Sequence, residues 1–171
     1  MPSDYQIKLG QDLLKELTNQ HPDFDTLRDY LKSKADLSQT DRHGNTALQL
    51  VVTWGNIALM KQMIDGGVDV NHKGTGGNTA LHTAVALRSK STIKLLIDNG
   101  ADAGIANDNG QTPVDCARGW DDADLADSVQ AKFNKVSAAK KEKADYEHSV
   151  NNGMPVLEPF QPLKQIQLRK P

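Results

Sequence analysis

The side chains that could carry out chemistry are few, and their spacing does not match a reaction centre. Cys116 is the only cysteine in the chain, and no motif sets a histidine or an asparagine around it, as a cysteine nucleophile requires. His43 and His72 lack the neighbouring Cys or His residues that a zinc site needs. We therefore expect Cys116 to be buried in a helix, and we expect no catalytic residue, no cofactor and no metal site.

Three further patterns could suggest anion or nucleic-acid chemistry, and each has a simpler explanation. The aspartates between 121 and 124 fall where a helix is expected to begin, and carboxylates there oppose the positive end of the helix dipole. The "KGTGG" loop at 73–77 follows no expected strand, unlike a phosphate-binding loop. The lysines at 140–143 are interrupted by a glutamate, so nucleic-acid binding is not expected.

Composition narrows the class of protein further. Of the 171 residues, 25% are charged and 37% are hydrophobic, and the net charge of −2 gives no field that would favour nucleic acid or an acidic membrane. No run approaches the roughly 20 apolar residues of a membrane helix, and the N-terminus lacks the apolar segment of a signal peptide. Together with the single cysteine, these features predict one domain plus an appendage in the cytoplasm. Delivery by a secretion route that reads no N-terminal signal stays open.

The sequence repeats itself with a fixed period. "GNTALQLVV" at 44–52 returns as "GNTALHTAV" at 77–85, and the step from Thr46 to Thr79 is 79 − 46 = 33. The same step leads on to Thr112, which opens "TPVDCA". A period of this size predicts a solenoid, in which each repeat is stabilised by its neighbours.

One repeat, residues 74–106, shows what each unit contains. Thr79 suits the N-cap of a first helix, "ALHTAVAL". After a break near Arg88, a second helix, "STIKLLID", places apolar residues on one face and stops at Gly100, which favours a left-handed C-terminal turn. The Gly, Asn and Asp residues of "ADAGIANDNG" then predict a hairpin-like crossing to the next repeat.

These motifs resemble the ankyrin repeat family, whose pattern runs G-x-T-P-L-H-x-A, two helices and then G-A-D-V-N. "GNTALHTAV" and "IKLLIDNGADA" match it closely, and the resemblance is clear over residues 41 to about 118. It implies an all-α ankyrin-repeat solenoid of about four helix-turn-helix units, two of them regular and two capping. The expected segments are an N-terminal extension at 1–7, repeats at 8–40, 41–73, 74–106 and 107–139, a helix extension at 140–149 and an extended, Pro-containing tail at 150–171.

The two terminal repeats depart from the family pattern. The first lacks the opening Gly-x-Thr, and its two helices are expected from Leu13, Leu14 and Leu17, then from Leu27, Tyr30 and Leu31. In the last repeat Phe133 occupies the position of Gly100, so no stop signal follows. The second helix of that repeat is therefore expected to continue to about His148.

The resemblance implies non-catalytic protein–protein recognition through the concave groove and the hairpin tips. It places His82 in hydrogen bonds between repeats. Trp54, Leu87 and Trp120 follow one another at the repeat period, with His21 one step earlier, and in this family that position faces the groove. Exposed tryptophans are common in binding hot spots. The candidate partner contacts are Arg42, His43, Asn45, Thr53, Trp54, Thr75, Asn78, Ala86, Leu87, Asp108, Asn109, Gln111 and Trp120.

The tail suggests a second kind of function. Leu157, Phe160, Leu163 and Ile166 are spaced by three, as along one edge of a polyproline II helix, and "PFQPLK" fits a loose SH3-ligand pattern. The tail could pack on its own domain, on a second copy, or remain free. One alternative function is therefore a carrier or regulator whose tail is the recognised ligand. A small modifying enzyme with residues in the tail is another, although no motif supports it.

Overall fold

The computed structural model describes residues 1–19, 22–119 and 123–151. Its helices are α1 (Asp4–Leu17), α2 (Phe24–Lys32), α3 (Ala47–Trp54), α4 (Ile57–Asp65), the short 3-10 helix η1 (Thr75–Gly77), α5 (Ala80–Ala86), α6 (Lys90–Asp98), α7 (Pro113–Gly119) and α8 (Ala123–Asn151). These ranges contain no strand beyond an isolated bridge between Thr40 and Thr46. The fold is all-α, as predicted.

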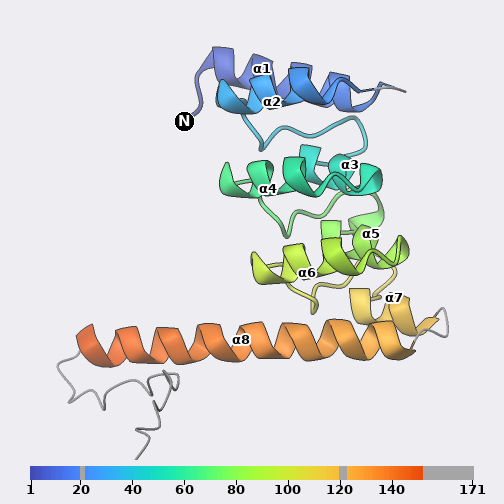
Figure 1. The fold of residues 1–171 in the computed structure, drawn as a ribbon, viewed down its shortest axis with the longest axis vertical. Coiled ribbons are helices and arrows are strands. Elements are labelled where there is room, and N and C mark those ends of the chain that lie inside the picture. The colour runs from blue at the N-terminus through green and yellow to red at the C-terminus, as the bar shows by residue number, and fades with distance from the viewer. Residues whose placement is uncertain (20–21, 120–122, 152–171) are drawn as a thin grey trace, which may run out of the picture. The chain divides into compact units, whose positions relative to one another are not determined.

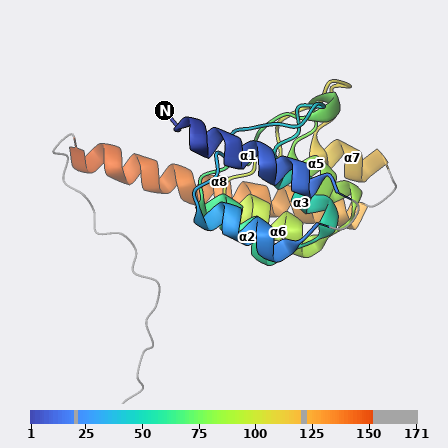
Figure 2. The same ribbon diagram turned by 90° about the horizontal axis from the view of Figure 1, so that it is seen from above.

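The chain divides into two compact parts, residues 1–134 and 135–171. The first part is a stack of helix pairs, in which α1, α3, α5 and α7 form one row, each helix contacting the next (Figure 1). The helices α2, α4 and α6 form the second row in the same way. Figure 2 shows the two rows beside each other from above. In the second part α8 continues to Asn151.

The stack forms because apolar residues recur at helical spacing on the faces that meet. Leu48 of α3, Leu81 of α5 and Leu96 of α6 are fully buried. Burying a leucine contributes roughly 1.5–3 kcal/mol relative to leaving it in water. Each repeat is too small to bury its own apolar face, so this stabilisation arises at the interfaces between repeats.

The second helices of the first three repeats, α2, α4 and α6, are each followed by a residue with left-handed backbone. Gly67 and Gly100 have φ of 88° and 99°, and Lys34 has φ of 57° at the equivalent place in the first repeat. The turn is closed by a backbone bond, which in the third repeat runs from Ala101 N–H to Leu96 C=O over 2.9 Å. Glycine adopts this conformation without strain, whereas a residue with a Cβ does so at a cost. Lys34 is therefore a weak point of the first repeat.

The first helix begins at Asp4, within the segment 1–7 that the sequence assigns to an extension. The reason is a capping box, in which Ser3 N–H donates to Gln6 Oε1 over 2.9 Å and Gln6 N–H donates to Ser3 Oγ over 3.3 Å. Farther along α1, a Cβ at Gly10 would collide with the Asp36 carbonyl oxygen. In the first repeat the backbone of α1 at Gly10 therefore lies directly against the backbone of Asp36, in the segment that follows α2.

The last described helix has the expected length. The helix α8 ends at Asn151, close to the predicted His148, and it passes the position of Gly100 at Phe133 without a break. Lys132 of α8 forms an ion pair of 3.3 Å with Asp98 of α6, which holds the start of α8 on the stack. In the ranges that the structure describes, no helix is both long and apolar enough to cross a membrane.

Candidate functional site

The crossings between repeats are hairpins of one shape, and their tips gather on one side of the helices (Figure 2). Each hairpin is closed by an N–H to C=O bond of 2.9 Å, from Asp41 to Asn45, from Gly74 to Asn78 and from Asn107 to Gln111. Gly44, Gly77 and Gly110 turn the tips with φ of 80°, 70° and 75°. Because the same turn recurs at the repeat period, equivalent tip residues project in similar directions.

Polar side chains join neighbouring hairpins to one another. Asn45 Oδ1 accepts hydrogen bonds from the N–H and the hydroxyl of Thr75, both 2.9 Å long. In the next pair of hairpins Asn107 Nδ2 donates to Asn78 Oδ1 over 3.0 Å. Among the predicted contacts, Asn45, Thr75 and Asn78 therefore hold the tips together, and a partner would meet them in that arrangement.

A second set of hydrogen bonds connects each first helix to the following hairpin. His82 lies beneath Thr79, whose N–H donates to His82 Nδ1 over 3.1 Å, and His82 Nε2 lies 3.0 Å from Gln111 C=O. Gln49 has the same role one repeat earlier, since its Nε2 donates to Asn78 C=O over 2.8 Å. The predicted structural role of His82 between repeats is confirmed, and glutamine fulfils it as well as histidine.

The surroundings of His82 keep its ring neutral. Burial lowers the pKa of His82, the hydrogen bond to Gln111 raises it, and the charge of Lys73 lowers it, with a net shift below the ordinary value. The tautomer with hydrogen on Nε2 satisfies both neighbours, because Nδ1 can then accept from Thr79. The ring is 3% exposed, so it is closed to substrate and acts as a structural bridge.

Two hollows lie between the first helices and the hairpins. The larger, of about 520 Å³, is lined by Gln11, Leu14, Lys15, Thr18, Thr40, Asp41, Arg42 and His43. The smaller, of about 250 Å³, is lined by Asn45, Gln49, Leu50, Thr53, Thr75, Asn78 and Thr83. Both are open to solvent, and they lie at successive hairpins on the side of the stack formed by α1, α3 and α5. Several predicted contacts line them, Arg42 and His43 in the larger and Asn45, Thr53, Thr75 and Asn78 in the smaller, and we call this side of the stack the groove.

Large apolar side chains are exposed at the ends of α3 and α5, and they are not among the residues that line the two hollows. Trp54, the last residue of α3, is 42% exposed, and Leu87, the C-cap of α5, is 51% exposed. These are equivalent positions, since 87 − 54 = 33, and their exposure is as predicted. Trp120 and His21 lie outside the described residues. Thr53, Ala86, Asp108, Asn109 and Gln111 are exposed on the same helix ends and hairpins.

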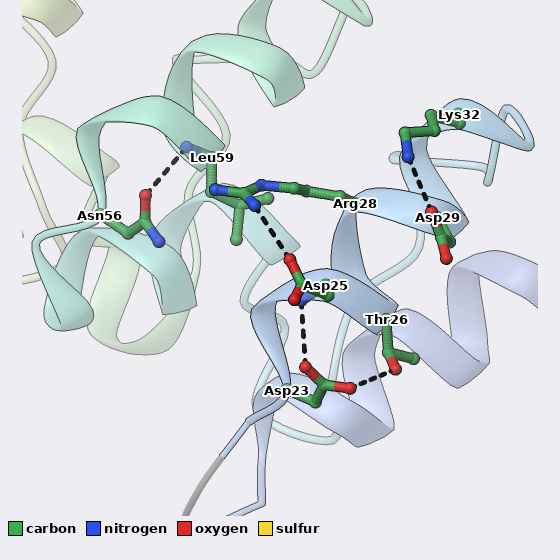
Figure 3. A network of polar contacts seen from close by, with 8 residues as sticks. All are labelled: Asp23, Asp25, Thr26, Arg28, Asp29, Lys32, Asn56 and Leu59. Carbon is green, nitrogen blue, oxygen red and sulfur yellow. Dashed lines mark hydrogen bonds and ion pairs between the residues drawn. The ribbon is translucent and has the colours of Figure 1, made fainter.

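The two cations of α2, Arg28 and Lys32, are paired with aspartates of the same helix. Figure 3 shows Arg28 reaching Asp25 and Lys32 reaching Asp29 on α2, each over 2.9 Å. At the start of this helix Asp23 caps the first turn, accepting the Thr26 hydroxyl over 2.6 Å and the N–H of Asp25 over 3.1 Å. This surface satisfies its own charges, in contrast to the hollow at α1.

Cys116 and His72, two of the residues considered for chemistry, lie in surroundings that the structure describes. Cys116 is half-buried, and burial, then the charge of Asp115, raises the pKa of its thiol, which disfavours the reactive thiolate. His72 Nε2 lies 2.9 Å from the carbonyl of Gly44 and so links two hairpins. Within the described residues, no group of three or more His, Cys, Asp or Glu side chains is arranged to hold a metal.

Six residues that line the larger hollow are not among the predicted contacts: Gln11, Leu14, Lys15, Thr18, Thr40 and Asp41. Lys15 faces the larger hollow beside Arg42 and His43, but the first repeat lacks the family motif that would have indicated which side of α1 meets the hairpin. The predicted tail contacts at Leu157, Phe160, Leu163 and Ile166 lie outside the described residues.

Comparison with known proteins agrees with this geometry. A family model described as ankyrin repeats, in 3 copies, matches residues 13–107 and, in an overlapping match, residues 55–128. No curated protein matches the chain significantly.

Proposed function

The chain belongs to the ankyrin-repeat family, whose members are in general protein–protein interaction modules, and we propose that it binds a protein partner in the groove between the first helices and the hairpins. Trp54 and Leu87 provide the apolar contacts, with Trp120 as a third by its place in the repeat period. The exposed tip residues Arg42, His43, Asp108 and Asn109 provide polar contacts at the rim.

The observation that carries the proposal is the exposure of Trp54 and Leu87 at equivalent positions. Single exposed apolar residues are common on proteins and need no explanation. A tryptophan and a leucine that recur at the repeat period are different, because equivalent positions in a solenoid project side by side. Covering them would recover part of the roughly 1.5–3 kcal/mol that burial of each large side chain contributes, and tryptophan is enriched among residues that dominate binding energy.

The hydrogen-bonded hairpins support the same proposal. The contacts between Asn45, Thr75 and Asn78 fix the tips before a partner arrives. A surface that is already ordered loses little conformational entropy on binding, so more of its contact energy contributes to affinity.

Peptide ligands selected from a random phage-displayed library on the intact protein test the proposal. Trp54→Ala should weaken the selected peptides on the order of tenfold or more. Tyr5→Ala is the matched control, because Tyr5 is a 66% exposed aromatic of α1 that does not share the repeat position of Trp54 and Leu87. Urea unfolding of both variants should resemble that of the natural protein. Ligands that bind the two variants equally well would show that the groove is not the working surface.

A further inference from the structure

The charged side chains that the structure describes around the larger hollow are positive in sum. Lys15 of α1 and Arg42 of the first hairpin are exposed and line this hollow together. Neither forms an ion pair with a carboxylate among the described residues, and the one side-chain contact of Arg42 is from its Nε to Nε2 of His43, 3.0 Å away. The cations of α2, by contrast, are paired with aspartates one turn away.

The only acid that lines this hollow is Asp41, and the hairpin itself uses its carboxylate. Asp41 accepts the N–H of His43 over 2.8 Å, the N–H of Asn45 over 2.9 Å and Nδ2 of Asn45 over 3.1 Å. Burial raises the pKa of Asp41, but these hydrogen bonds outweigh it and hold the pKa below its ordinary value. Asp41 therefore stays ionised but is directed into its own turn, and with Lys15 and Arg42 against this one acid the charged side chains that line the hollow keep a net positive charge.

The charge also changes sign along the hairpin tips. At one equivalent tip position the three successive hairpins carry Arg42, Thr75 and Asp108, which are positive, neutral and negative. The Arg42 end of the groove would attract a negative group, and the Asp108 end would repel one. A partner segment with acids at one end would therefore bind in one direction.

We propose that the hollow between α1 and the first hairpin binds an acidic segment of the protein partner, through Lys15 and Arg42. The inference rests on the proposed function, because it assigns the chemistry and the direction of the ligand in the same groove. An acidic stretch lies against α1, and apolar residues that follow it reach Trp54 and Leu87.

The charge of the chain's own tail favours a foreign ligand over self-binding. Residues 152–171 contain one acid, Glu158, against Lys164, Arg169 and Lys170. A segment of that charge is repelled by two unpaired cations. The ligand that the hollow selects is therefore an acidic stretch from another protein.

The test compares the peptides that a random phage-displayed library yields on the intact protein and on two charge variants. Lys15→Glu with Arg42→Glu reverses the charge of the hollow. Lys8→Glu with Lys61→Glu makes the same change in net charge at exposed lysines that line neither hollow. Circular dichroism and urea unfolding establish that all three proteins fold alike.

Peptides selected on the natural protein should be enriched in Asp and Glu. They should lose on the order of tenfold in affinity for the hollow variant at low salt, keep their affinity for the control variant, and lose less when salt screens the charges. Peptides that depend on Trp54 but are not acidic, or that ignore the reversal at Lys15 and Arg42, would overturn this inference and leave the proposed function intact. Failure to obtain any peptide that depends on either site would overturn both.

Discussion

Replacing His82 tests the hydrogen-bonded bridge that holds successive repeats together. His82→Leu keeps an apolar volume in the same place but removes the acceptor for Thr79 N–H and the donor for Gln111 C=O. Thr79 is 1% exposed, so its unpaired N–H should cost about 1–3 kcal/mol. Gln111 is exposed, and water can take over part of its bond, which adds at most about 1 kcal/mol. We expect a total loss of roughly 1–4 kcal/mol in the free energy of unfolding.

His82→Gln should behave differently, because Gln49 already bridges the preceding repeats with the same two bonds. Its cost at neutral pH should stay below about 1 kcal/mol, since a bridged glutamine leaves no buried polar group unpaired. Urea unfolding followed by circular dichroism measures both variants. If the glutamine variant loses as much stability as the leucine variant, the bridge is not what His82 contributes, and the reasoning fails.

A comparison of the natural protein with the His82→Gln variant also tests the protonation of His82. Its pKa in the folded protein is lowered, so its stabilising contribution is complete above the unfolded-chain pKa of about 6.5. That contribution is lost as the pH falls through the folded-state pKa, because the unfolded chain then binds the proton more readily. Between pH 7.5 and 5 the natural protein should lose more stability than His82→Gln, and equal losses would contradict the assignment of a neutral ring.

Two further substitutions examine the stack. Leu96→Ala should cost on the order of 2–5 kcal/mol in urea unfolding, because Leu96 is fully buried at the interface between repeats; a loss below about half a kcal/mol would contradict its place in the core. Lys34→Gly should raise the free energy of unfolding by up to about 1 kcal/mol, since glycine removes the strain of a left-handed backbone at φ 57°. A destabilised glycine variant would show that the Lys34 side chain contributes more than its backbone costs.

The repeat period made most of the fold predictable, because it constrains all positions at once. It aligned Thr46 with Thr79 and Trp54 with Leu87 and indicated which apolar residues are buried, while the resemblance to the ankyrin family implied that Trp54 and Leu87 are exposed, and the structure has all of these features. The period does not predict the start of α1, because the first repeat lacks the Gly-x-Thr motif; the capping box of Ser3 and Gln6 is the local signal that marks it.

The predicted site was harder to judge than the fold. The period gives the position of Asn45 and Asn78 but not where their amides point, and both turn to neighbouring hairpins. Lys15 has no counterpart in the family motif, so only the packing of α1 against the hairpin shows that it lines the hollow. The role of the candidate residues in binding a partner stays a prediction.

The residue at the position of Gln49, His82 and Asp115 also determines where further repeats can be added to the stack. Gln49 and His82 each offer an N–H to the next hairpin, but the equivalent residue of the last repeat is Asp115, whose carboxylate turns back to accept Thr112 N–H and its hydroxyl over 3.0 and 2.6 Å. An ionised carboxylate has no hydrogen to donate. A repeat inserted after Asp115 would therefore lack the side-chain hydrogen bond that Gln49 and His82 make to the next hairpin. Duplication of a middle repeat brings its own donor with it. Lengthening by gene duplication, in evolution or in the laboratory, should therefore be tolerated between residues 41 and 106 and should fail beyond Asp115 unless that residue is also changed.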